Sequence, residues 1–218
     1  MNIVSVSRRT DIPAFYSEWF MNRVRVGHMT VFHPYTQKEI AVSLVPEDVV
    51  AFVFWSKNYA PLLPHFDELT RRGYHFYCHF TITGLPKSIE TNVIPTDMAI
   101  AQFKEISQRF SPEHVQWRFD PIVITEATDL NFHKENFKRI ASALTRSTYR
   151  CYTSFMHPYG RALRNFKQAG ISVSNLPDEQ KALFAASLSE EAGKYGMTLY
   201  ACSNDILVGG KVQKASCI

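Results

Sequence analysis

The sequence is short of glycine and cysteine, and it has no long apolar run. Nine glycines in 218 residues argue against a glycine-rich nucleotide loop and against a repeat architecture. The apolar runs are all too short for a membrane span, which argues against a membrane protein. With no export signal, the four widely spaced cysteines are predicted to be reduced thiols in the cytoplasm. These cysteines are Cys78, Cys151, Cys202 and Cys217.

Short metal-binding motifs and blocks of basic residues are also missing. No HxH, HExxH or CxxC spacing occurs, so no metal site is predicted. The net charge of +4 and the pI of 8.8 favour anionic ligands only weakly. Without a Lys/Arg block, the sequence does not resemble a protein with a nucleic-acid-binding tail.

Aromatic residues and strand–helix alternation are what the sequence does have. Its 16 Phe and 10 Tyr can supply a large core. Strand and helix patterns alternate about six times over the chain, which predicts an α/β fold with a mainly parallel sheet. A small hairpin over residues 29–33 and 39–43 interrupts the alternation. We find no linker, so residues 1–218 are predicted to form a single domain.

The alternation of side chains within the strands favours a barrel. A parallel sheet covered by helices on both faces should read as near-continuous apolar runs. Instead, each strand has one polar face, such as Tyr77, His79 and Thr81 in one strand and Arg118 and Asp120 in the next. Burying such groups without partners costs about 2–7 kcal/mol each. We therefore predict a partial (β/α) TIM-like barrel with a polar lumen, built from about six strands with a small hairpin insertion.

The first helix is expected over residues 15–26, ending at Gly27. Its predicted apolar side consists of Phe15, Trp19, Phe20 and Val24.

Charged and polar side chains gather at the ends of the predicted strands. Arginine recognises phosphate or carboxylate groups through paired hydrogen bonds, so the strand-end arginines are expected to hold an anion. Asp11 and Asp120 are the candidate catalytic residues, each as a general base or as a group that orients a donor. The candidate ligand-binding residues are Arg8, Arg9, Lys57, Asn58, His79, Thr81, Arg118, Ser154 and Asn204.

Some of these residues have a structural interpretation that fits equally well. Arg118 and Asp120 can form an ion pair that only stabilises the fold. Cys202 ends the last strand and has the position of a nucleophile, but free cysteines are commonly inert core residues, and we predict that it is inert.

Four motifs, taken in order, resemble a bacterial family catalogued as domain of unknown function 1848. They are SRRTDIPAFY at residues 7–16, FWSKN at 54–58, FTITG at 80–84 and WRFDP at 117–121. The resemblance covers essentially the whole chain, and the first and fourth motifs are the specific ones. The family has no established activity that could be carried over.

Longer members of that family resemble circularly permuted radical S-adenosylmethionine barrels and continue into a CxxxCxxC segment. The resemblance therefore implies an enzyme-like barrel with an iron–sulfur cluster and S-adenosylmethionine as cofactors. The present sequence contains no CxxxCxxC pattern. A partner chain would then supply the missing part, or the barrel would keep only a binding role.

Three functional hypotheses follow from these observations. The first is an enzyme-like barrel that binds an anionic small molecule, a nucleotide or an S-adenosylmethionine-like ligand, at the strand C-terminal ends. The alternative is a non-catalytic subunit or a nucleic-acid-binding module, which predicts steep salt dependence of binding. A weaker alternative is a metal-dependent hydrolase that uses Asp11, His79 and Asp120 and requires a bound divalent metal.

Overall fold

The computed structural model describes residues 2–7, 9–157 and 159–216. The chain divides into two compact units, Met1–His79 and Phe80–Ile218, which we call the first and the second unit. Each unit is described by itself, and the prediction of a single domain stays a prediction.

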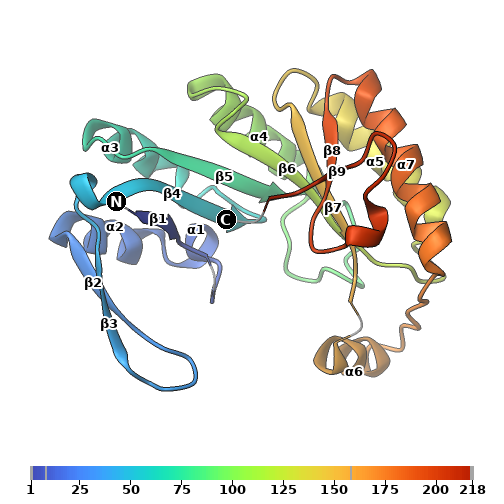
Figure 1. Ribbon diagram of the computed structural model, residues 1–218, viewed down its shortest axis with the longest axis horizontal. Coiled ribbons are helices and arrows are strands. Elements are labelled where there is room, and N and C mark those ends of the chain that lie inside the picture. Colours follow the sequence, from blue (N-terminus) through green and yellow to red (C-terminus); the bar gives the residue numbers. More distant parts are fainter. Residues whose placement is uncertain (1, 8, 158, 217–218) are drawn as a thin grey trace. The chain divides into compact units, whose positions relative to one another are not determined.

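The first unit holds parallel strands and an antiparallel hairpin (Figure 1). β1 pairs in parallel with β4, with Val4 beside Phe52 and Ser5 beside Val53. The amide of Phe52 donates to the carbonyl of His75, just before β5, at 2.9 Å. The elements are β1 (Asn2–Ser5), α1 (Ile12–Phe15), α2 (Ser17–Val26), β2 (His28–Phe32), β3 (Glu39–Ser43), η1 (Pro46–Asp48), β4 (Val49–Ser56), η2 (Leu63–His65), α3 (Phe66–Arg71) and β5 (Phe76–Thr81), whose last two residues belong to the second unit.

Aromatic packing holds α2 and α3 against one face of β4. The ring of Phe20 in α2 lies 5.1 Å from that of Phe52. Phe66 in α3 lies 6.2 Å from Phe54 and 4.5 Å from Phe76. All five rings are buried, so this cluster forms the core of the first unit.

The predicted helix over residues 15–26 is broken at Tyr16. α1 ends before this residue and α2 begins after it, so the helical phase counted through Phe15 does not continue. Of the predicted apolar side, Phe20 and Val24 are buried. Phe15 and Trp19 are not packed with them, because their exposed fractions are 73% and 43%.

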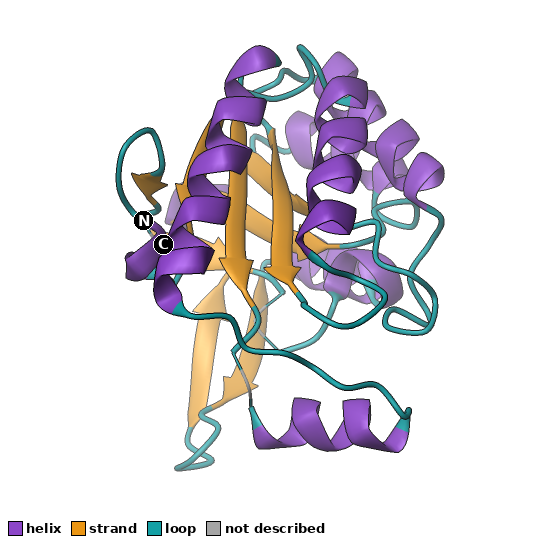
Figure 2. Ribbon diagram, turned by 90° about the vertical axis from the view of Figure 1, so that its right-hand side faces the viewer, coloured by secondary structure: helices purple, strands orange, loops and turns teal. Residues whose placement is uncertain are grey.

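The second unit alternates strands and helices in sequence order. β6 pairs in parallel with β7, with Arg118 beside Tyr152, and β7 pairs with β8, with Tyr152 beside Tyr200. α6 buries no residue and lies apart from these strands (Figures 1 and 2). The elements are α4 (Thr96–Arg109), β6 (Val115–Ile122), α5 (Leu130–Ala143), β7 (Arg150–Phe155), α6 (Gly160–Gln168), α7 (Asp178–Lys194), β8 (Thr198–Ala201), η3 (Asp205–Leu207) and β9 (Gln213–Lys214).

Helices α4, α5 and α7 cover one face of the strands of the second unit. Phe137 of α5 lies 4.8 Å from Trp117, and Phe184 of α7 lies 6.2 Å from Phe155. Phe103 of α4 packs on the end of β5. Right-handed crossovers between strands that are neighbours in both sequence and space place α4, α5 and α7 on the same side of these strands.

The strand order is β1-β4-β5-β6-β7-β8-β9, which is an open, seven-stranded parallel sheet in an α/β fold. The sequence predicted about six strands, and the seventh is β9, which is only two residues long. The order is linear, so the structure does not confirm a barrel. Among the described residues, no helix has both the length and the apolar character that a membrane crossing needs.

The predicted alternation of faces is confirmed in the second unit. Trp117 and Phe119 point to the helix-covered face and are at most 2% exposed. The opposite side of β6 to β8, which we call the polar face, carries the other parity of side chains. It is defined by Arg118, Asp120, Tyr152, Tyr200 and Cys202.

One ion-pair cluster joins α2 to α3 and predicts a pH dependence. Arg25 donates to both carboxylate oxygens of Glu68, at 2.9 and 2.6 Å, and Arg72 donates at 2.8 Å. Hydrogen bonding to Arg25, supported by Arg72, lowers the pKa of Glu68 to about 2. Because this pKa lies below that of the unfolded chain, the stabilisation is complete above pH ~4.5 and is lost as the pH falls towards 2.

We therefore expect Glu68→Gln to lower the free energy of unfolding at pH 7 by no more than about 1 kcal/mol, because the cluster is on the surface. The difference in free energy of unfolding between the variant and the wild type should stay constant from pH 7 to 5 and then decrease down to pH 3. Urea unfolding at each pH measures this difference. A difference that grows on acidification would contradict the lowered pKa of Glu68.

Candidate functional site

Arg118 and Asp120 form a close pair on the polar face. Nε and Nη2 of Arg118 donate to the two carboxylate oxygens of Asp120, at 3.1 and 2.5 Å. Only 14% and 12% of the two side chains is exposed, so the pair is largely withdrawn from water. This geometry is the paired, fork-like contact that fixes a guanidinium plane.

The pair keeps Arg118 charged. Burial by itself would lower the pKa of the guanidinium, but the charge and hydrogen bonds of Asp120 outweigh burial and raise the pKa. Among the described residues, Nη1 of Arg118 donates no hydrogen bond. The fixed guanidinium therefore keeps donors available for a further acceptor.

Cys202 belongs to the same cluster, and the prediction that its thiol is inert stays a prediction. It follows β8, and its sulfur accepts a hydrogen bond from Nη2 of Arg118 at 3.3 Å. Cys78 and Cys151, in contrast, are completely buried, and burial raises the pKa of both thiols. Cys202 is the partly exposed thiol in the described part of the chain, and its contact is with a cation.

Aromatic rings continue the polar face beside Arg118. The guanidinium carbon of Arg118 lies 5.6 Å from the ring centre of Tyr152. Tyr152 stacks on Tyr200 with 5.3 Å between ring centres and 23° between planes. The carbon of Arg150 lies 5.8 Å from the ring of Tyr200. Two stacked rings on β7 and β8 are thus flanked by two cations, Arg118 and Arg150.

Two predicted ligand-binding residues lie at the end of β7 and beyond β8. Ser154 is partly exposed near the C-terminal end of β7. Asn204 accepts a hydrogen bond from the amide of Phe155 at 3.0 Å, and its Nδ2 lies 3.3 Å from His157. Asn204 therefore ties the loop after β8 to the end of β7, which is a positioning role.

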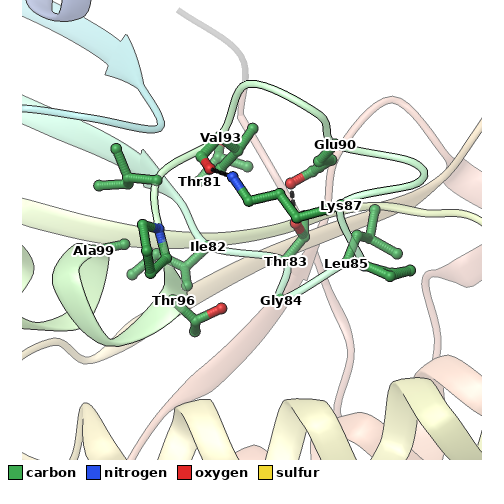
Figure 3. Close-up of a pocket in the computed structure, with 13 residues that line it drawn as sticks. Thr81, Ile82, Thr83, Gly84, Leu85, Lys87, Glu90, Val93, Thr96 and Ala99 are labelled. Carbon is green, nitrogen blue, oxygen red and sulfur yellow. Dashed lines mark hydrogen bonds between the residues drawn. The ribbon is translucent and has the colours of Figure 1, made fainter.

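Thr81 lines a cavity of about 250 Å³ between the end of β5 and the start of α4 (Figure 3). Inside it, the hydroxyl of Thr83 donates to Glu90 at 2.9 Å, and Lys87 donates to the carbonyl of Val93. Gly84 has a φ of 62°, and a Cβ there would collide with the side-chain amide of Asn136. The polar groups of this cavity are thus largely occupied by one another.

Asp11 in the first unit is an N-cap. One carboxylate oxygen accepts from the amide of Ala14 at 3.0 Å, and the other accepts from the hydroxyl of Ser56 at 2.9 Å. Burial raises the pKa of Asp11, and hydrogen bonds from Ser56 and from the backbone of Ala14 and Lys57 offset part of the rise. Both oxygens have partners, so the position suits a structural tie better than a general base.

The other predicted residues of the first unit make separate local contacts or are exposed. Asn58 accepts from the amide of Ala60 at 3.1 Å, which forms a local turn. His79 is 6% exposed and stacks on Trp55 at 5.0 Å. Lys57 is partly exposed and Arg9 is exposed. Arg8 lies outside the described residues.

The described residues do not form a metal or cluster site. In residues 2–7, 9–157 and 159–216, no three His, Cys, Asp or Glu side chains gather in a way that would hold a metal ion. An iron–sulfur cluster needs several thiolates together. Cys78 and Cys151 are buried in the core, so they do not fit, and Cys217 lies outside the described residues. We derive no step through such a cluster.

Comparison with protein-family models identifies a family over almost the whole chain. Residues 3–218 match the family described as "Domain of unknown function (DUF1848)". No curated protein matches the chain.

Proposed function

Because the chain belongs to the DUF1848 family, whose description names no activity, we propose a function from the geometry of the polar face. The proposal is that the second unit binds a small anionic ligand with a planar group, a nucleotide or an S-adenosylmethionine-like molecule. Binding would occur near the C-terminal ends of β6, β7 and β8, where parallel sheets commonly hold ligands.

The observation that carries the proposal is the fixed guanidinium of Arg118. Asp120 holds its plane, and Nη1 keeps two donors for a phosphate or carboxylate oxygen. In this proposal Asp120 is a positioning residue, because both of its oxygens accept from Arg118. Cys202 lies 3.3 Å from the same guanidinium and would contact a ligand held there.

The planar part of the ligand is inferred from the aromatic layer. Tyr152 and Tyr200 stack next to the guanidinium, and a base or another flat ring would add to that layer. Burial raises the pKa of Tyr152, so its phenol stays neutral at physiological pH. Since Asp120 balances the charge of Arg118, donor geometry and stacking would govern affinity more than net charge.

A shallow salt dependence follows from that balance, and it separates this proposal from nucleic-acid binding. A chain that neutralised several phosphates would lose affinity steeply with salt.

A partial barrel belongs to the same proposal. Each parallel strand follows its sequence neighbour without the reversal of order that defines a doubly wound sheet. This singly wound order supports a sheet that curves around the ligand, as in (β/α) barrels.

The test is isothermal titration calorimetry with AMP. Adenosine and inorganic phosphate, which correspond to the two parts of AMP, are titrated separately for comparison. We expect AMP to bind about tenfold or more tightly than adenosine, because only AMP offers an anion to Arg118. Arg118→Lys keeps the positive charge but loses the paired donors of the planar guanidinium, and it should weaken AMP binding about tenfold or more. Arg109→Lys is the matched control, since Arg109 pairs with Glu105 on the outer side of α4 at 3.0 Å.

The control should keep the wild-type affinity for AMP within about twofold. Equal affinities of the wild type and Arg118→Lys would contradict the proposal, as would the lack of saturable AMP binding to the wild type. Thermal unfolding of each variant shows that it is folded before titration.

A further inference from the structure

The first unit contains a second candidate site, a mainly apolar groove of about 460 Å³. Its walls come from β1, the turn after β1, α2 and the β2–β3 hairpin. The volume lies within the range of small-molecule pockets. We call it the β1 groove, and its walls include Val4, Ser5, Val6, Trp19, Phe32 and Val42.

The β1 groove runs along an unpaired strand edge. Val4, Ser5 and Val6 all line it, and consecutive side chains alternate faces, so the groove lies beside the edge of β1. β1 ends the strand order and pairs with β4 on its other side. The amide of Val6 donates to Val53 at 2.9 Å, so backbone alternation directs the amide of Ser5 towards the unpaired edge.

Arg9 and Ser5, with Thr10 and Thr30, are the polar residues of a mainly apolar lining. Arg9 is the charged residue of the lining, and its Nη2 donates to the carbonyl of Phe32, which orients the guanidinium across the groove. The remaining donors of Arg9 make no hydrogen bond among the described residues. The hydroxyl of Ser5 is buried and has no hydrogen-bond partner in the described part of the chain. A ligand oxygen in the groove would accept from the remaining donors of Arg9.

The apolar surface extends beyond the groove. A neighbouring hollow of about 260 Å³ shares Thr10, Ile12 and Trp19 with it and is also lined by Tyr16. Trp19, Tyr16 and Phe32 are each more than 40% exposed, which is unusual for side chains of this size unless something covers them. One cation at the rim of an extended apolar surface matches a ligand with one anionic end and an apolar body.

We propose that the β1 groove binds a small hydrophobic carboxylate. The carboxylate lies on Arg9, which can offer a paired hydrogen bond, and the apolar body lies against Trp19, Phe32 and Val42. This site goes beyond the proposed function, because it shares no residue with the polar face. Among the described residues of the lining, Arg9 carries the one positive charge, and the other walls are mainly apolar, which favours this ligand over a polyanion that would need several cations.

The test is a titration of octanoate, with octanol as the uncharged match, followed by the indole NMR signal of Trp19. Octanoate should shift that signal saturably and bind about tenfold or more tightly than octanol. Arg9→Met, which keeps the length and removes the charge, should remove this advantage and leave octanol binding within about twofold. Arg71→Met, at an exposed position of α3, is the matched control and should bind octanoate as the wild type does.

Three results would overturn the proposal: no saturable shift of Trp19, equal affinities of the wild type for octanoate and octanol, or octanoate binding unchanged in Arg9→Met. Arg9 is exposed, so its variants are expected to fold. Arg9→Lys provides a second variant, and it should keep part of the preference for octanoate because the charge remains.

Discussion

Arg118→Ala is expected to lower the free energy of unfolding by about 3 kcal/mol. The substitution leaves the carboxylate of Asp120, whose side chain is 12% exposed, without the partner that balances its charge. We expect a loss at the lower end of the range for breaking a buried ion pair, because both side chains keep some contact with water. Urea unfolding of the second unit, followed by its tyrosine and tryptophan signals, measures the loss.

The double variant Arg118→Ala/Asp120→Ala distinguishes the cost of leaving Asp120 unpaired from the cost of removing the Arg118 side chain. It removes both charges, so it should regain much of the stability that the single variant loses. Arg109→Ala removes an exposed partner of Glu105 and should cost no more than about 1 kcal/mol. If Arg118→Ala were as stable as the wild type, the pair would not be the fixed element that the proposed site needs.

Trp117→Ala is expected to destabilise the second unit by about 3–5 kcal/mol. Its indole is completely buried, and its ring lies 4.8 Å from that of Phe137. Nε1 also donates to the carbonyl of Ile82 at 2.9 Å, so alanine leaves a cavity and removes a hydrogen bond from a buried carbonyl.

Trp117→Phe keeps most of the ring volume and should lose clearly less stability than Trp117→Ala. Trp19→Ala is a control for the removal of an indole at a site that is 43% exposed, and it should also cost less. Chemical denaturation of the three variants gives the ranking. A loss of less than about 1 kcal/mol for Trp117→Ala would show that α5 does not depend on this indole.

The alternation of polar and apolar residues was enough to predict which side chains share a face. Arg118 and Asp120 lie opposite Trp117 and Phe119, as the period of two requires. The same alternation could not decide between a barrel and an open sheet, because both leave one side of the strands without helices. Closure depends on strand tilt and curvature, which the side-chain pattern does not encode.

Asp11 shows how one residue type fits two roles. Its position after two arginines suggested a catalytic carboxylate, but Asp followed by Ile12-Pro13 is also the pattern of an N-cap and a first helical turn. Its amide and hydroxyl partners, Ala14 and Ser56, favour the second interpretation. The capping pattern was already present in the sequence.

Cys202 could not have been placed from the sequence. Its partner Arg118 is 84 positions away, and no local motif connects them. Its parity with Tyr200 puts it on the polar face, but the contact with a guanidinium requires the pairing of β6, β7 and β8. Contacts of this kind arise from topology and are not visible in a single strand.

The most direct test of the proposed site is solution NMR of the arginine Nε–Hε and tyrosine ring signals during a titration with AMP. The account predicts saturable shifts of Arg118, Tyr152 and Tyr200 with one common dissociation constant, while Arg109 on α4 stays unchanged. Saturable shifts elsewhere, with these three side chains unaffected, would contradict it and remove the polar face as the ligand site.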